Sequence, residues 1–194
     1  MCSTGAAEAN FTSFPECYAA ARSTRAFDSF APQEPKVLKS ERFTIRFDDL
    51  ENGWLTVRIK QGNAEYTFFP SHVPYDSIRE LTDGLGNLLL GDTQATVHWN
   101  DEPIEHEFVF DKTGNELSFR VLLLNETRLG KQPEEVFGLQ GTLYEIIRPF
   151  WVALRDLETR YPAEEYQRRW REPFPVNEMR VLTAHFEKLK RAQV

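Results

Sequence analysis

The sequence predicts an α+β fold: a six-stranded, mainly antiparallel sheet with the C-terminal helices packed on one face. The sheet is expected to consist of two three-stranded meanders joined by a helix. Three observations predict this. Apolar and polar residues alternate in two groups of strands, at 43–68 and 94–124; a helical repeat separates the groups; and helical repeats follow from residue 143 onward. This order differs from the strand–helix alternation of a parallel nucleotide-binding sheet.

The clearest strand pattern is the hairpin at 94–110. A loop at 101–104 gives one register in which the inward pairs match, and a slip of one residue would expose the aromatic side chains to water. The predicted pairs are Ala95–Phe110, Val97–Phe108 and Trp99–His106. A third strand, at 117–123, presents a matching apolar face. We expect Phe110 to lie opposite Leu117, across a turn in which Gly114 or Asn115 takes a positive φ.

The first meander begins at Glu41, and its strands are separated by glycine-containing turns. Asn52-Gly53 and Gln61-Gly62 are typical of two-residue hairpin turns. The second turn fixes the register of the second and third strands. The predicted core-side pairs are Ile59–Ala64, Val57–Tyr66 and Leu55–Phe68, and those on the other face are Arg58–Glu65, Thr56–Thr67 and Trp54–Phe69.

The helix that joins the meanders is predicted to begin near Ser77, because Ser77 and Glu80 have capping-box spacing. Gly91 is placed to end it. Its apolar stripe comprises Ile78, Leu81, Leu85, Leu88 and Leu89. Gly84 and Gly86 should each cost about 1 kcal/mol relative to alanine inside a helix. We therefore expect them to allow a neighbouring element to approach closely.

A polar loop at 125–135 is expected to lead into three helices. The first has apolar residues at i, i+3, i+4 spacing from Leu143 to Leu157. Pro149 should kink this helix, because its ring clashes with the preceding turn. The second helix is expected to bury Tyr166 and Trp170, and the last to bury Met179, Leu182, Phe186 and Leu189.

The formal net charge of −7 over 194 residues limits the classes of partner. Nucleic acids and anionic membranes bind basic surfaces, so the charge argues against both and allows a basic protein partner. Arg168, Arg169 and Arg171 lie among glutamates, which predicts ion pairs rather than stacking on RNA. No run of about 18 apolar residues predicts a membrane span.

We expect one α+β domain at 41–194, preceded by an N-terminal arm at 1–40. The arm is either flexible or contains a short helix after Ser13. Cys2 and Cys17 are the only cysteines, too few for a disulfide framework or a four-thiolate metal site. The N-terminus also lacks the basic and then apolar pattern of a secretory signal. Together these features indicate reduced thiols and a cytoplasmic protein.

Residue types that bind metals crowd one hairpin: His98, Glu105, His106 and Glu107. The register argues against a shared metal ion, because His98 and Glu107 lie on the polar face and His106 on the core face. We expect His106 to be a hydrogen-bonded histidine at the edge of the core. The sequence also lacks a Gly-x-Ser-x-Gly turn and a Gly-Lys-Ser/Thr phosphate loop. No catalytic residue, metal or cofactor is therefore predicted.

The sheet face opposite the helices is the remaining candidate for function. It is predicted to show Trp54, Phe69, Arg46, Arg58, Glu65, His98 and Glu107, and the predicted binding residues among them are Trp54, Phe69, Arg58, His98 and Glu107. Protein partners commonly anchor on aromatic and arginine side chains, so we expect Trp54 and Phe69 to act as anchors. Alternatively, the N-terminal arm folds back and covers both.

These features predict a soluble, non-enzymatic protein-binding module that neutralises or scaffolds a basic protein. The general architecture is similar to that of many small bacterial proteins without catalytic groups, including immunity proteins that neutralise toxins. This resemblance implies a protein partner and no residue roles. The alternative is a small-molecule or hydrolytic site, in a cleft between sheet and helices, that uses His98, Glu107 or His106. Self-association through an edge strand or the last helix is a further possibility.

Overall fold

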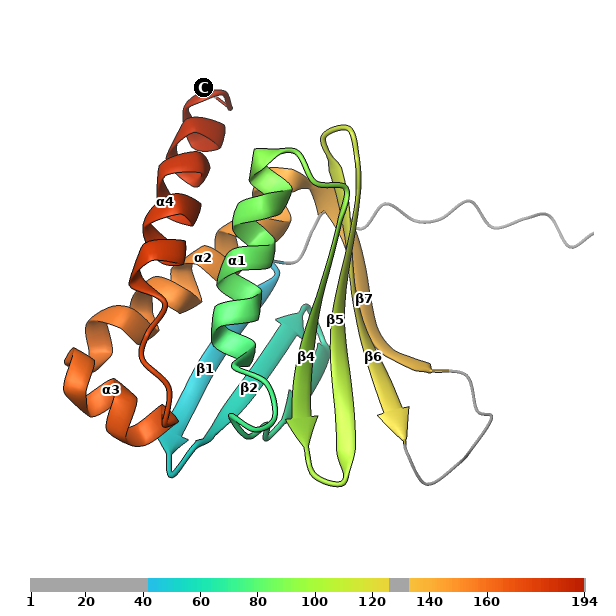
Figure 1. The fold of residues 1–194 in the computed structure, drawn as a ribbon. Coiled ribbons are helices and arrows are strands. Elements are labelled where there is room, and N and C mark those ends of the chain that lie inside the picture. Colours follow the sequence, from blue (N-terminus) through green and yellow to red (C-terminus); the bar gives the residue numbers. More distant parts are fainter. Residues whose placement is uncertain (1–41, 126–132, 194) are drawn as a thin grey trace, which may run out of the picture. The chain divides into compact units, whose positions relative to one another are not determined.

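The computed structural model describes residues 42–125 and 133–193, which belong to one compact unit, Val37–Val194. The expected arm at 1–40 lies outside the described residues. The described elements are β1 (Thr44–Glu51), β2 (Trp54–Gln61), β3 (Ala64–Phe68), α1 (Ser77–Leu90), β4 (Gln94–Asp101), β5 (Ile104–Thr113), β6 (Glu116–Asn125), β7 (Glu134–Thr142), α2 (Leu143–Arg160), α3 (Ala163–Trp170) and α4 (Val176–Arg191) (Figure 1). The fold is α+β, as predicted.

The strands form a three-stranded and a four-stranded antiparallel sheet rather than the single six-stranded sheet that we expected. The sheets meet at Ser71, which bridges Trp54 at the start of β2 and Asn100 near the end of β4. The Ser71 N–H donates to the Asn100 carbonyl at 2.7 Å, and the Leu55 N–H donates to the Pro70 carbonyl at 3.1 Å. Pro70 has no N–H to donate. The regular pairing of β3 therefore ends at Phe68, and the isolated bridges of Ser71 follow it.

Two hairpins have the geometry that the sequence predicts. The pairs Ala95–Phe110, Val97–Phe108 and Trp99–His106 are all present between β4 and β5. The turn between β1 and β2 lies at Asn52 and Gly53, whose φ angles are 53° and 81°. Two positive φ angles in succession match the right-handed twist of the flanking strands, which favours Asn-Gly at this position.

The other two hairpins are shifted by two residues from the predicted registers. The observed pairs are Gln61–Ala64, Lys60–Glu65, Ile59–Tyr66, Arg58–Thr67 and Val57–Phe68 between β2 and β3, and Phe110–Phe119 between β5 and β6. The turns centre on 62–63 and 114–115, where Gly62 and Gly114 have φ angles of 61° and 62°. A shift of two residues preserves the alternation of faces. Leu55, Val57, Ile59 and Phe68 are therefore still buried as predicted, whereas Ala64, at the start of β3, is exposed.

β7 is a strand that the sequence analysis missed, since we expected a polar loop up to residue 135. It pairs with β6 and places Phe137, which is buried, opposite Val121. Gly138 and Gly141 interrupt its apolar pattern, and glycine is uncommon inside strands. Residues 126–132, between β6 and β7, lie outside the described part of the chain.

Side chains cap the starts of α1 and α2. The residue that caps α1 is Asp76 rather than Ser77, because the Asp76 carboxylate accepts from the Arg79 N–H. Gly91 ends α1 as predicted. Thr142 and Glu145 form a capping box at the start of α2. The expected kink at Pro149 does not interrupt α2, which is helical from Leu143 to Arg160.

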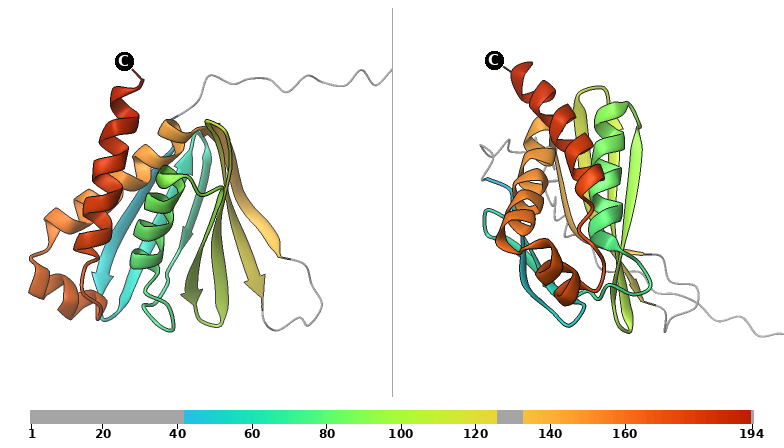
Figure 2. Two further views of the ribbon diagram at one scale, coloured as in Figure 1. Left: turned by 45° about the horizontal axis from the view of Figure 1, so that its top comes forward. Right: turned by 60° about the vertical axis from the view of Figure 1, so that its left-hand side comes forward.

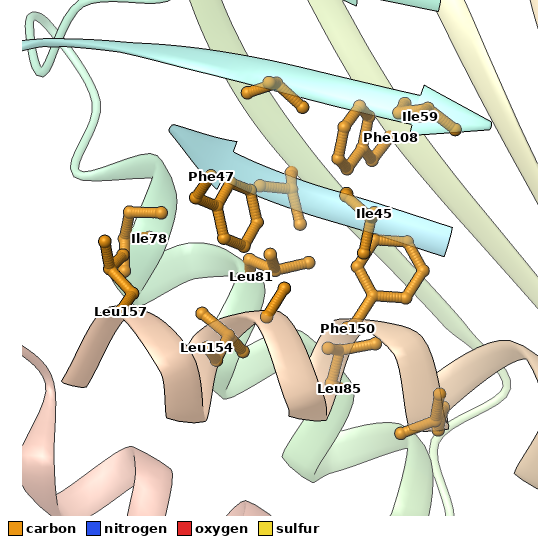
Figure 3. Packing of buried hydrophobic residues seen from close by; sticks show 14 of the residues in the cluster. Ile45, Phe47, Ile59, Ile78, Leu81, Leu85, Phe108, Phe150, Leu154 and Leu157 are labelled. Carbon is orange, nitrogen blue, oxygen red and sulfur yellow. The ribbon is translucent and has the colours of Figure 1, made fainter. Parts of the chain in front are cut away.

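One hydrophobic core connects the sheets and the helices. α1 packs beside β4, α2 packs against β1, β6 and β7, and α4 packs on α1 and α2 (Figure 2). Side chains from both sheets face those of α1 and α2, among them Ile45, Phe47, Ile59, Phe108, Ile78, Leu81, Leu85, Phe150, Leu154 and Leu157 (Figure 3). No helix in the described part of the chain is long and apolar enough to cross a membrane.

Candidate functional site

The five residues predicted for a binding face lie in three places. His98 on β4 and Glu107 on β5 are cross-strand partners, with 3.7 Å between Nε2 and Oε1. Arg58 lies in the three-stranded sheet. Trp54 and Phe69 lie where the two sheets meet. Trp54 bridges Ser71 rather than pairing with Phe69, so the predicted surface is divided between the two sheets and their junction.

Three exposed apolar side chains belong to residues at or near the Ser71 bridge: Trp54, Phe69 and Val73, which we call the junction patch. The exposed fractions of Trp54 and Phe69 are 40% and 54%. Hydrogen bonds hold the backbone beneath them. The Phe69 N–H donates to the Asp101 carboxylate at 3.3 Å, and Asn100 Nδ2 donates to the Val73 carbonyl at 2.5 Å. The patch is therefore presented on a fixed backbone rather than on a free loop.

Five carboxylates lie at the end of β1, at the turn between β4 and β5, and on β5: Glu51, Asp101, Glu102, Glu105 and Glu107, which we call the acidic rim. Glu51 is the cross-strand partner of Trp54, and Glu105 and Glu107 share the outer face of β5. Burial raises the pKa of Asp101, and the hydrogen bond from the Phe69 N–H lowers it to a lesser extent. An aromatic patch beside several carboxylates is complementary to a basic surface.

His98 is held between two carboxylates by the packing of α1 along β4. The Glu80 carboxylate accepts from the backbone N–H of His98 at 2.9 Å and lies 3.2 Å from its Nδ1. Ser77 Oγ donates to the His98 carbonyl at 2.6 Å. These contacts satisfy backbone groups on the outer edge of β4, which would otherwise be open to another strand. Glu80 could not be placed here from sequence, because this contact depends on how α1 packs.

His106 lies on the opposite side of the sheet from His98 and is only 2% exposed. Its Nε2 is 2.7 Å from the Tyr66 hydroxyl, and its ring stacks on Phe68 with 4.2 Å between centroids. Burial lowers the pKa of His106 to about 4, so the imidazole is neutral at pH 7. The predicted role of a hydrogen-bonded histidine in the core is confirmed.

The cavity between the sheets and α2 lies away from these histidines. It measures about 170 Å³ and is lined by residues that include Phe43, Leu139, Tyr144 and Arg148, but neither histidine nor Glu107. In the described part of the chain, no group of three or more His, Cys, Asp or Glu residues could hold a metal ion.

No family model, curated protein or solved structure matches this chain. Function therefore has to be inferred from the geometry of the surface. On that surface Arg58 belongs to a second cluster, in which it lies 3.5 Å from Asp48 and near Arg46 and Arg160. This cluster could not be found from the sequence, because Arg160 lies more than 100 residues after Arg46 and Arg58.

Proposed function

We propose that this protein is a non-enzymatic binding module whose partner is a protein with a basic surface. The partner contacts the junction patch and the acidic rim. The observation that carries the proposal is the exposure of Trp54 and Phe69 at the meeting point of the two sheets. Large aromatic side chains contribute most to stability when they are buried, and at interfaces they dominate the binding energy. Both rings would therefore contribute binding energy when a partner buries them.

The carboxylates of the acidic rim also favour a basic partner. Glu51 pairs with Trp54 across the strands and Asp101 accepts from the Phe69 N–H, in a chain whose formal net charge is −7. Opposite charge on a partner steers the encounter and raises the association rate, most strongly at low ionic strength. Wrong partners with acidic surfaces are repelled by the same carboxylates. Aromatic anchors with a charged rim therefore favour a basic protein over an acidic one.

The alternative, a hydrolytic site that uses His98, Glu107 or His106, has less support from the geometry. His106 is buried beneath Tyr66 and Phe68, whereas both ring nitrogens of His98 face carboxylates on the other side of the sheet. A nucleophile and its base must lie within hydrogen-bonding reach of one substrate. The two histidines lie on opposite faces of a sheet and do not meet that condition, and the 3.7 Å between His98 Nε2 and Glu107 Oε1 is longer than a hydrogen bond.

The test is affinity capture from native lysate with the full chain and two variants. Wild-type protein should retain one or more basic proteins, and Trp54→Ala/Phe69→Ala should lose them. Each large anchor commonly accounts for about 2 kcal/mol or more, or roughly a thirty-fold change in affinity. The matched control is Leu90→Ala, since Leu90 is equally exposed but lies at the end of α1. Retention of the same proteins by wild type and by the double variant would contradict the proposal.

A further inference from the structure

We propose that the cavity between the sheets and α2 binds a small aromatic carboxylate. This cavity, which we call the α2 cavity, measures about 170 Å³. It lies where the residues just before β1, the end of β2 and the end of β7 meet the first two turns of α2. An apolar cavity of about 150 Å³ is large enough to hold benzene. The size of the α2 cavity therefore suits a ligand with one aromatic ring.

The apolar walls of the α2 cavity are fixed by packing. They are formed by Phe43, Leu139, Tyr144, Ile146 and Pro149. The ring centroid of Phe43 lies 5.5 Å from that of Phe150, and Tyr144 stacks on Phe186 with 5.6 Å between centroids. Aromatic rings pack favourably against one another, and walls that are fixed before binding lose little conformational freedom. The walls are therefore suited to the ring of a ligand.

Gly141 leaves space open beside the first turn of α2. A Cβ at this position would lie 3.2 Å from Glu145 Oε2 and 3.4 Å from Ile146 Cδ1. Both of these residues line the α2 cavity, so a side chain at 141 would crowd its wall. The glycine keeps that room free for a ligand.

Two exposed arginines, Arg42 and Arg148, also line the α2 cavity. In the described part of the chain neither forms an ion pair, in contrast to the four arginines beside the first hairpin. One carboxylate lines the cavity, that of Glu145, and it caps α2. Its Oε2 accepts from the Thr142 N–H at 3.0 Å and from the Thr142 hydroxyl at 2.9 Å. Two guanidinium groups therefore stand against one carboxylate that is bonded to the helix start.

The positions of these charges favour a carboxylate on the ligand. A guanidinium group binds a carboxylate through two parallel hydrogen bonds. Because both arginines are exposed, a carboxylate bound to them stays in contact with water and avoids the cost of a buried charge. The ring gains from leaving water for the apolar walls. A ligand with one ring and one carboxylate thus matches both parts of the α2 cavity.

The α2 cavity is separate from the junction patch. Trp54 begins β2, whereas Gln61, which lines the cavity, ends it. A strand rises about 3.3 Å per residue, which puts roughly 23 Å between these two residues. Loss of ligand binding and loss of the protein partner can therefore be measured independently.

The test uses benzoate as the probe and the full-length chain. Benzoate, benzamide and acetate are each titrated by calorimetry and by amide NMR shifts at constant ionic strength. Wild type should bind benzoate saturably, with the largest shifts at Gly141 and Tyr144. It should bind benzamide and acetate at least tenfold more weakly, because benzamide lacks the charge and acetate lacks the ring. Arg42→Gln/Arg148→Gln should bind benzoate at least tenfold more weakly than wild type, because charge-assisted hydrogen bonds are lost.

The matched control is Arg180→Gln/Arg191→Gln, which removes the same charge from exposed positions of α4 that do not line the cavity. It should leave benzoate affinity unchanged. All four arginines are exposed, so thermal melts should show that both variants fold. Equal benzoate affinity in the two double variants, or no saturable binding by wild type, would overturn the proposal. Acetate that binds as tightly as benzoate would overturn the assignment to an aromatic ligand, and benzamide that does so would overturn the assignment to a carboxylate.

Discussion

His106 shows how one polar residue connects the two sheets. It belongs to β5, yet it contacts Tyr66 and Phe68 of β3 through a hydrogen bond and a stacked ring. Burial raises the pKa of Tyr66, and the charges of Asp101 and Glu134 raise it further, so the phenol stays neutral. Two neutral groups can share a hydrogen bond inside the core without the desolvation cost of a buried charge. This contact lies between the sheets, where the backbone supplies only isolated bridges.

The depressed pKa of His106 predicts an acid-sensitive stability. Burial lowers it from 6.5 to about 4, so between these values the unfolded chain binds a proton that the folded chain does not. This contribution is fully present above pH 6.5 and is lost as the pH falls toward 4. The free energy of unfolding should decrease by about 3 kcal/mol over this window.

Urea denaturation of wild type and His106→Gln at several pH values measures this effect. Between pH 6.5 and pH 4, the free energy of unfolding should fall less steeply in the variant than in wild type, whatever the stability of the variant at pH 7. The raised pKa of Asp101 acts in the opposite direction, since its folded state favours the proton, but it is present in both proteins. Parallel curves for the two proteins would contradict the assignment to His106.

At the scale of elements, alternation predicts which side chains face the core, and turn geometry decides the register. The two wrong registers, of β2 with β3 and of β5 with β6, are each shifted by two residues. Gly62 occupies the first position of its turn, whereas we expected it in the second. Gly114 also occupies the first position of its turn, which the sequence did not determine. β7 was missed because two glycines break its pattern. The division into two sheets depends on how the chain passes Pro70 and Ser71, which no local pattern shows.

Asp76 caps α1 and also accepts a hydrogen bond from the end of α3. Its carboxylate accepts from the Arg79 N–H at 3.3 Å and from Trp170 Nε1 at 3.1 Å, so it joins α1 to α3. Asp76→Ala should cost about 2–4 kcal/mol, because it removes a cap and leaves the buried indole N–H without a partner. Thr142→Ala removes only the cap of α2 and should cost about 1 kcal/mol. Equal losses in chemical denaturation would contradict the double role of Asp76.

Gly84 and Gly86 of α1 should respond differently to alanine. A Cβ at Gly84 would lie 3.2 Å from the Ala95 Cβ, whereas a Cβ at Gly86 would lie 4.0 Å from the backbone nitrogen of Leu182. Gly86→Ala should therefore raise the free energy of unfolding by up to about 1 kcal/mol through helix propensity. Gly84→Ala should gain less, because Ala95 must move. Thermal melts that show equal gains would remove the packing reason for Gly84.

At the scale of the whole molecule, packing brings together surface groups from distant parts of the chain. Arg160 of α2 and Arg169 of α3 lie beside Arg46 and Arg58 of the first hairpin, and each of these four guanidinium groups has a carboxylate partner. Sequence spacing predicts the pairing of His98 with Glu107, because both lie in one hairpin. It cannot predict which side chains of β1, β2, α2 and α3 meet, nor the position of Glu80 beside His98. Sites built from distant elements need the packed helices to be known.

The central claim, that a basic protein docks on the junction patch, is tested most directly by site-specific photo-cross-linking in native lysate. A benzophenone side chain replaces Phe69 in one protein and the control residue Leu90 in another; both are exposed, but only Phe69 belongs to the junction patch. We predict that the probe at 69 forms a covalent adduct with a basic protein, identified by mass spectrometry and weakened by high salt. The probe at 90 should not. The absence of an adduct at 69, or the same adduct at both positions, would contradict the account.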